Sequence, residues 1–173
     1  MDLNIVSNEE KFLAGKLEGY TLKGAENKFD DKGNPLPFPG CTIICNIPLN
    51  TNLSDEISSF QKKIKNFNPE KTYFYLPQSS FHMTLFDCCN LNTKNTNNWP
   101  SDIDLDMDHK DIAFELNKRI KNYNFPKEFN LKLKTFFGGY SIILEPFSKK
   151  DEKILRNCRD ELSSLLKIKF ENH

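Results

Sequence analysis

The chain has 173 residues, of which 38% are hydrophobic and 28% charged. This length and composition suit one ordinary domain with an apolar core, and we expect a single unit over residues 1–173. Lysine plus arginine number 24, as do aspartate plus glutamate, so the formal net charge is zero. A balanced charge argues against a broad basic surface for long duplex nucleic acid, but it is compatible with a small anionic ligand or an RNA end.

The cysteines indicate the compartment. They number 5, an odd count, and the first residues lack a basic segment followed by an apolar one. We therefore expect reduced thiols in an intracellular, cytoplasmic protein. No apolar run approaches the roughly 20 residues that cross a bilayer, so no membrane partner is expected.

The first third of the chain predicts a lead-in, a strand and a helix. Residues 1–35 are polar and interrupted by glycines, which predicts an irregular segment with at most a short helix over 10–17. After the last proline of that region, the β-branched run 41–47 predicts a buried strand. Apolar residues then recur at helical spacing from Leu53 to Phe67, which predicts an amphipathic helix.

The middle of the chain predicts two strands, a loop and a helix. Residues 71–76 and 81–86 have strand composition and are separated by a polar segment that begins with a proline. The stretch 87–108 is rich in Asn and Asp, which predicts a long polar surface loop. Asp108 is expected to cap a helix that continues to about Tyr123.

The last third predicts a hairpin and a helix. Residues 129–137 alternate between apolar and polar, and Gly138-Gly139 then leads into a second β-type run, as in a tight hairpin. Ser148 and Asp151 resemble a capping box before the last helix. The resulting order, β-α-β-β-loop-α-β-β-α, predicts an α+β protein with antiparallel sheets and flanking helices.

The most distinctive chemistry lies in the run 79–86. In a strand, His82, Thr84 and Phe86 project from one face, and the residues between them project from the other. An imidazole moves a proton near neutral pH, and a neighbouring hydroxyl donates to an anionic oxygen, so the pair suits a phosphate. The alternative interpretation is a half-buried strand histidine that is hydrogen-bonded to a neighbour.

Other candidate ligands are weaker. Lys132 and Lys134 share the polar face of their strand and can meet a phosphate, although a solvent-facing pair is an equal alternative. Tyr75 can stack a base or simply pack. The cysteines lack the spacing of zinc ligands, and the aspartates over 102–108 lack the glycine and glutamate of a calcium loop. We therefore expect no metal and no cofactor.

Beyond these single residues, longer segments carry a family resemblance. Residues 36–45 and 76–87 resemble the N-terminal half of the 2H phosphoesterase superfamily, in particular its cyclic-phosphodiesterase-like branch. Trp99-Pro100, together with Arg156 and the segment 159–162, extends the resemblance, which then spans roughly residues 33–165.

The resemblance implies a two-lobed architecture in which each lobe contributes a strand with His-x-Thr or His-x-Ser. It implies metal-independent attack on a nucleotide or RNA-end phosphodiester, of the 2′,3′-cyclic or 2′-5′ type. One histidine would act as general base and the other as general acid, while the hydroxyls hold phosphoryl oxygens. Onto this sequence the resemblance carries two catalytic residues, His82 and Thr84.

The sequence departs from that pattern because its 173 residues contain no second motif. We therefore expect an incomplete C-terminal lobe. Either activity is impaired, or another group such as His109 or His173 enters the cleft. The competing function is a catalytically inactive module that binds a nucleotide or a protein, so the sequence leaves open whether the chain is an enzyme.

Overall fold

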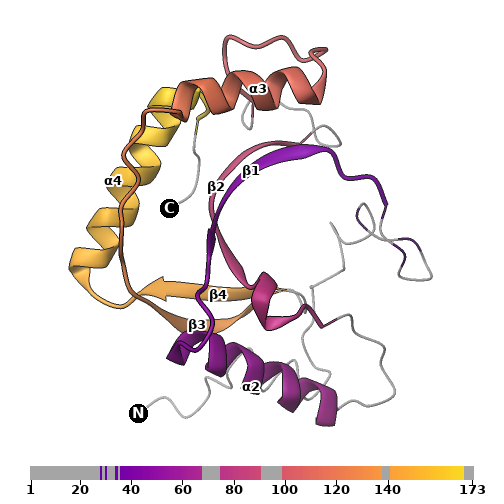
Figure 1. Ribbon diagram of the computed structural model, residues 1–173, viewed down its shortest axis with the longest axis vertical. Coiled ribbons are helices and arrows are strands. Elements are labelled where there is room, and N and C mark those ends of the chain that lie inside the picture. Colours follow the sequence, from indigo (N-terminus) through magenta and orange to yellow (C-terminus); the bar gives the residue numbers. More distant parts are fainter. Residues whose placement is uncertain are drawn as a thin grey trace, which may run out of the picture. The chain divides into compact units, whose positions relative to one another are not determined.

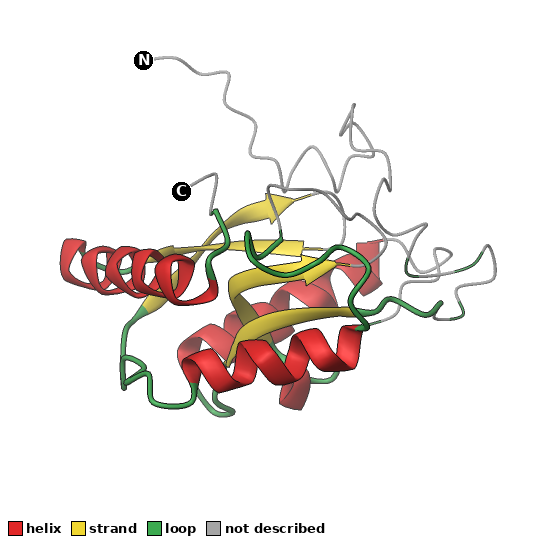
Figure 2. Ribbon diagram, turned by 90° about the horizontal axis from the view of Figure 1, so that it is seen from above, coloured by secondary structure: helices red, strands yellow, loops and turns green. Residues whose placement is uncertain are grey.

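The computed structural model describes residues 28, 30, 34, 36–67, 75–90, 99–137 and 141–169. Its elements follow in the order β1 (Gly40–Asn46), α2 (Asn52–Phe67), the 3-10 helix η1 (Gln78–Ser80), β2 (His82–Asn90), α3 (His109–Ile120), β3 (Leu131–Phe137), β4 (Ser141–Pro146) and α4 (Lys149–Leu166) (Figure 1). The described residues form helices and two two-stranded antiparallel sheets, so the fold is α+β, as predicted (Figure 2).

The chain divides into two compact units, each assembled from separate segments. The first unit comprises residues 1–23, 46–83 and 131–146, and the second comprises 24–45, 84–130 and 147–173. Each is described by itself below. The expectation of a single domain over the whole chain stays a prediction.

The first unit contains α2, η1 and the hairpin of β3 with β4. Helix α2 packs against β3, and it buries Ile57 and Phe60 on one face, as the helical spacing of its apolar residues predicts. Strands β3 and β4 are antiparallel, with Phe137 opposite Ser141. This confirms the predicted hairpin, although the glycine turn itself lies outside the described residues. A register shift between Leu133 and Thr135 marks an irregularity in β3.

The second unit contains α3 and α4, which contact each other. Its apolar core is formed by residues of the two helices together with the second half of β2, and by the indole of Trp99, which donates a hydrogen bond to the carbonyl of Ile103 at 3.0 Å. The helical members of that core are Ile112, Leu116, Leu155, Cys158, Leu162 and Leu166. These residues recur at helical spacing, as expected of amphipathic helices. In α4, however, the sequence predicts a face that includes Ile154 and Leu165, whereas Leu155 and Leu166 are buried in their place and Leu165 is 40% exposed.

Strands β1 and β2 form the second sheet among the described residues. The backbone N–H of Ile47 donates to the carbonyl of Phe81 at 2.9 Å, while Gly40, at the other end of β1, lies against Cys89 near the end of β2. The strands therefore run antiparallel (Figure 1). The predicted strand over 41–47 is confirmed as β1 (Gly40–Asn46), but its predicted burial is wrong, because its residues alternate between exposed and half-buried.

Both caps predicted for the later helices are present. The Asp108 side chain accepts from the backbone N–H of Lys110 at 2.8 Å at the start of α3. The hydroxyl of Ser148 accepts from the N–H of Asp151 at 3.2 Å at the start of α4. Each cap satisfies a backbone donor that the first helical turn leaves without a partner.

Two sequence-based expectations need correction. Strand β2 continues to Asn90, so the predicted loop over 87–108 begins later than expected, because Cys88 and Cys89 are buried rather than solvated. Phe86 is 0% exposed, so it does not share the open surface of His82 and Thr84. The alternation of exposed and buried side chains ends at Leu85.

Other expectations fall partly or wholly outside the described residues. The lead-in helix over 10–17 lies outside them, as does most of the predicted strand over 71–76. Tyr75 and Leu76, its described part, belong to no strand. Within the described part of the chain, none of the helices has the length and apolar character needed to cross a membrane.

Asp151 predicts a pH-dependent contribution to stability. Hydrogen bonds from the Ser148 hydroxyl, and then from the backbone N–H of Asn130 at 2.9 Å, hold the pKa of this carboxyl below its usual value. A lowered pKa stabilises the fold above the unfolded value of about 3.9, and the contribution is lost as pH falls through the folded pKa. We expect Asp151→Asn to lower Tm by a few degrees at pH 7, and the difference from wild type to disappear in acid.

The control is Asp160→Asn, because Asp160 is exposed on the same helix. It should leave Tm unchanged at either pH in thermal scans. A deficit of Asp151→Asn that persists at low pH would contradict the assignment to ionisation.

Candidate functional site

The start of β2 presents the imidazole of His82 to solvent. Its Nδ1 lies 2.9 Å from the backbone carbonyl oxygen of Ser80. A carbonyl can only accept, so Nδ1 carries the proton in the neutral ring, and the lone pair is on Nε2. The exposed Nε2 is therefore the atom that can accept a proton from a ligand.

Hydrogen bonds within the first unit fix the segment that holds this ring. The amide of Gln78 donates to the hydroxyl of Ser54 at 3.1 Å and to Oδ1 of Asp55 at 3.2 Å, which ties η1 to the start of α2. Ser54 is fully buried, and the side chain of Ser80 bonds back to Pro77 at 2.8 Å. The carbonyl that orients His82 is thus part of a fixed turn.

Thr84 lies two residues further along β2 and is also exposed, while Met83 between them is half-buried. Its hydroxyl makes no side-chain hydrogen bond with any residue that the structure describes, which leaves it able to donate to a ligand. The predicted pair therefore stands on the open side of the strand, as the alternation requires. The alternative of a half-buried His82 does not hold, although its ring is bonded to a neighbour.

The backbone next to Thr84 is held by a residue from the last helix. Nε of Arg159 in α4 donates to the carbonyl oxygen of Leu85 at 3.0 Å. Arg159 is half-buried, and burial is the main cause that lowers the pKa of its guanidinium. A charged donor on a backbone carbonyl is a stronger link than a neutral one. Arg159 thus fixes the strand from within the second unit.

The two candidate lysines meet a carboxylate. Nζ of Lys132 lies 3.1 Å from Oε1 of Glu145, and Nζ of Lys134 lies 3.7 Å from Oε2 of the same residue. All three are substantially exposed, and the hydrogen bond from Lys132 is the largest cause that lowers the pKa of Glu145. The structure brings the two lysines together around one carboxylate, so this group of three side chains has a net charge of one positive unit.

The remaining predicted candidates stand on other segments of the chain. Tyr75 is half-buried just before η1. His109 is exposed at the first residue of α3, with Nδ1 3.6 Å from Oδ2 of Asp108. His173 lies outside the described residues. The predictions of a stacking role for Tyr75 and of a second proton-transfer group therefore stay predictions.

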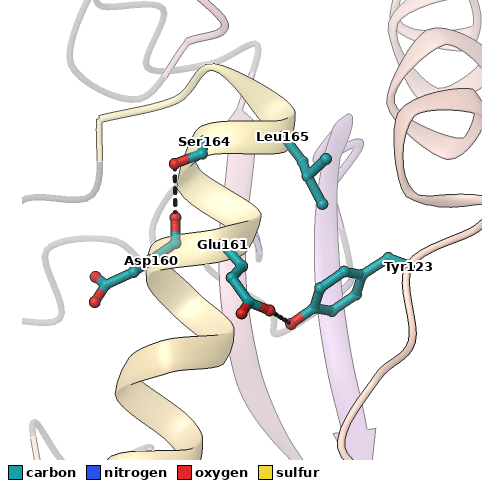
Figure 3. Close-up of a pocket in the computed structure, with 5 residues that line it drawn as sticks. All are labelled: Tyr123, Asp160, Glu161, Ser164 and Leu165. Carbon is teal, nitrogen blue, oxygen red and sulfur yellow. Dashed lines mark hydrogen bonds between the residues drawn. The ribbon is translucent and has the colours of Figure 1, made fainter.

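An open groove of about 470 Å³ lies in the second unit, and none of the predicted site residues lines it. The phenol of Tyr123 points toward α4 and donates to Glu161 at 2.7 Å (Figure 3). Burial, together with bonds to Cys158 and Glu161, raises the pKa of this tyrosine. Asp160 also lines the groove, so its wall carries two carboxylates and repels a phosphate.

Sequence reasoning missed the residues that position the pair. From the sequence, Gln78 and Ser80 belong to a polar separator between two predicted strands, and Arg159 has no predicted role in the site. The polar segment directly before the strand with His82 is a sequence feature from which the short helix η1 could have been predicted. By contrast, the bond from Arg159 to Leu85 joins residues 74 positions apart, and no local pattern indicates it.

Comparison with known proteins places these features in a family. The family model described as "2H-phosphodiest: Domain of unknown function (DUF1868)" matches residues 28–138, more than half of the chain. The chain belongs to this family. Its membership confirms the resemblance to 2H phosphoesterases and supports a phosphoesterase-type function, that of a phosphodiesterase-like hydrolase.

A solved structure gives the same fold. The chain is similar to a conserved protein of unknown function from Agrobacterium tumefaciens, with a TM-score of 0.79 and 18% sequence identity over 95% of this chain and 71% of that one. At this identity the likeness concerns the fold alone. The search of curated proteins found no match.

The contact between His82 and Ser80 predicts the tautomer of the ring. When the His82 ring is neutral, we expect its proton to be on Nδ1 and not on Nε2, because Nδ1 faces the carbonyl oxygen of Ser80. Nitrogen chemical shifts of labelled histidine distinguish the two forms. The opposite tautomer at high pH would show that the bond to Ser80 does not govern the ring.

The bond from Arg159 to Leu85 predicts that the two arginines of α4 contribute differently to the free energy of unfolding. We expect Arg159→Met to lower the free energy of unfolding by about 1.5–3 kcal/mol, because the Leu85 carbonyl loses a charged donor. The matched control is Arg156→Met, which removes only an exposed pair with Glu152 and should cost less than about 0.5 kcal/mol. Urea denaturation measures both, and equal losses would contradict a special role for Arg159.

Proposed function

We propose that this protein is a metal-independent phosphodiesterase that acts on a nucleotide or RNA-end phosphodiester, of the 2′,3′-cyclic or 2′-5′ type. The observation that carries the proposal is the exposed pair at the start of β2. Nε2 of His82 has its lone pair available, and the hydroxyl of Thr84 is exposed two residues away. Family membership supports the reaction class.

In the proposed reaction His82 performs one of the two proton transfers and Thr84 binds the phosphoryl group. If His82 is the base, Nε2 takes the proton of the attacking water while the water oxygen forms a bond to phosphorus, and another group protonates the leaving oxygen. If His82 is the acid, the protonated ring lies on the other side of phosphorus and gives its proton to the leaving ester oxygen as the P–O bond breaks. The Thr84 hydroxyl donates to a non-bridging oxygen, where a positioned donor stabilises the developing charge.

Lys132, Lys134 and Tyr75 are proposed to contact the substrate. The lysine pair supports this role because it carries one more positive charge than Glu145 neutralises. A phosphate approaching it competes with an exposed carboxylate, which costs little to displace. We place the reaction in the cytoplasm, with no cofactor.

A second candidate function is binding without turnover. It is favoured because the 173 residues hold one His-x-Thr motif, and the other histidines are His109 and His173. Losing one member of an acid/base pair typically removes on the order of 10² to 10⁴ in rate, while anion binding by the hydroxyl can persist. A nucleotide-binding or protein-interaction module would then result.

Hydrolysis of a nucleoside 2′,3′-cyclic phosphate tests the first function. We expect His82→Ala to lower kcat on the order of 10² to 10⁴-fold, because the proton acceptor is lost. Thr84→Val should lower kcat, since the hydroxyl donor is removed without a change of shape, and Thr84→Ser should retain most activity. His109→Ala and His173→Ala show whether either ring supplies the second proton transfer.

The control for His82 is Ser79→Ala, at an exposed neighbour whose side chain is not assigned a role. Unchanged turnover in His82→Ala would remove this residue from the mechanism. Calorimetric titration with nucleoside monophosphates separates the two functions. Heat of binding without product supports the module, and no heat and no product argue against both.

A further inference from the structure

Two contacts show that β2 has one more residue than the stretch of β1 that it faces. The first joins the backbone N–H of Ile47 to the carbonyl of Phe81. The second joins the hydroxyl of Thr42 to the carboxylate of Asp87. From Thr42 to Ile47 is five positions along the chain, whereas from Phe81 to Asp87 is six. An extra residue on one strand between two such contacts is a β-bulge.

The bulge falls at Leu85 and Phe86. These neighbours are 2% and 0% exposed, although successive residues of a regular strand project to opposite faces. The extra residue of a bulge leaves the ladder of hydrogen bonds, and the carbonyl of Leu85 accepts instead from Nε of Arg159 at 3.0 Å. Arg159 therefore bonds to the bulge itself.

The bulge brings Asp87 to the same face of the sheet as Thr84. In a regular strand these two residues, three positions apart, would project to opposite faces. One extra residue returns them to one face, and burial agrees. Within the second unit, Thr42, Ile44, Thr84 and Asp87 are all exposed, whereas the residues between them on each strand are buried or half-buried. These four exposed residues are the open face of the sheet in this unit.

The open face continues from the residue that is proposed to bind the phosphoryl group. In the register set by the first contact, Ile44 stands opposite Thr84, and its side chain is 46% exposed. Thr42 and Asp87 form the next pair on this face, about 7 Å further along the strands. A nucleobase lies at a similar distance from the phosphorus of its own nucleotide.

The Asp87 carboxylate suits the base of a nucleotide rather than its phosphate. It repels a second anion, and it accepts hydrogen bonds without donating any. Thr42 donates to Oδ1 at 3.1 Å, which orients the carboxylate and leaves Oδ2 to accept from a ligand. The amino groups of cytosine, adenine and guanine are such donors. Uracil offers one N–H between two carbonyl oxygens, and these repel a carboxylate.

We propose that the open face binds the nucleobase of the substrate and that Asp87 selects bases with an exocyclic amino group over uracil. This inference rests on the proposed function, because Thr84 is taken as the group that binds the phosphoryl oxygen. Ile44 packs against the base, an apolar contact that every base can make. Thr42 is a positioning residue, since it acts on the base through the carboxylate of Asp87.

Calorimetric titration of the whole chain with the four nucleoside 3′-monophosphates tests the proposal without turnover. We expect the guanosine, cytidine and adenosine compounds to bind about 10-fold more tightly than the uridine compound, because a carboxylate that accepts from a base amino group discriminates by that order. Asp87→Asn should bring the four dissociation constants together, since an amide can donate to a uracil oxygen as well as accept from an amino group.

Matched variants separate the roles. Asp160→Asn removes one charge from an exposed residue of the same unit and should keep the base preference. Thr42→Val should reduce the preference, because the carboxylate loses the donor that orients it. Ile44→Ser should weaken the binding of all four nucleotides to the same extent and leave their ratio unchanged. Thermal scans check that each variant folds.

Equal affinity for the uridine nucleotide and the other three would overturn the inference while the proposed function stands. So would an Asp87→Asn variant that keeps the wild-type ratios. An Asp87→Asn variant that weakens all four nucleotides equally would assign the carboxylate to a hydroxyl of the ribose and would contradict selection of the base. If no nucleotide binds, the proposed function and this inference fail together.

Discussion

The antiparallel pairing of β1 with β2 is the constraint on which the proposed site at the start of β2 depends. At one end, the bond from Ile47 to Phe81 sets the position at which β2 begins, so His82 is its first residue. Toward the other end, the hydroxyl of Thr42 donates to Oδ1 of Asp87 at 3.1 Å and joins the two strands. Pairing of this kind uses backbone N–H and C=O groups, so it positions the side chains of a strand without occupying their own hydrogen-bonding groups. The imidazole of His82 and the hydroxyl of Thr84 are therefore positioned by the strand and remain exposed.

The polar contacts around β2 position His82 and Thr84 without occupying the atoms that are proposed to react. Ser80 uses one ring nitrogen of His82 and leaves the other exposed, while Arg159 bonds to a backbone carbonyl rather than to the Thr84 hydroxyl. Both supports come from elements whose own ends are fixed, η1 by Gln78 and α4 by the cap at Ser148. This arrangement reduces the reorganisation needed when a charged group arrives, which is the general advantage of a preorganised site.

Local sequence patterns predict most of the helices, strands and caps, whereas the contacts between distant segments depend on tertiary structure. The hairpin, the amphipathic helices and the caps at Asp108 and Ser148 follow from periodicity and from short polar motifs, and the structure contains them. The end of β2 was misplaced because Cys88 and Cys89 precede an Asn-rich stretch, and nothing local distinguishes a buried cysteine from a loop cysteine. The bond from Ile47 to Phe81 needs the pairing of β1 with β2, and the bond from Arg159 to Leu85 needs the packing of α4. Neither is a property of neighbouring residues.

The number of proton-transfer groups decides between turnover and binding. In-line displacement places the attacking water and the leaving oxygen on opposite sides of phosphorus. A single imidazole that accepts the proton of water becomes imidazolium on the attacking side, where it cannot reach the leaving oxygen. A good leaving group, or a second acid, must then complete the step. An alkoxide of ribose is a poor leaving group without a proton. In the proposed reaction His82 and Thr84 would bind and orient the phosphodiester, and efficient cleavage would require a second group on the far side of the phosphorus.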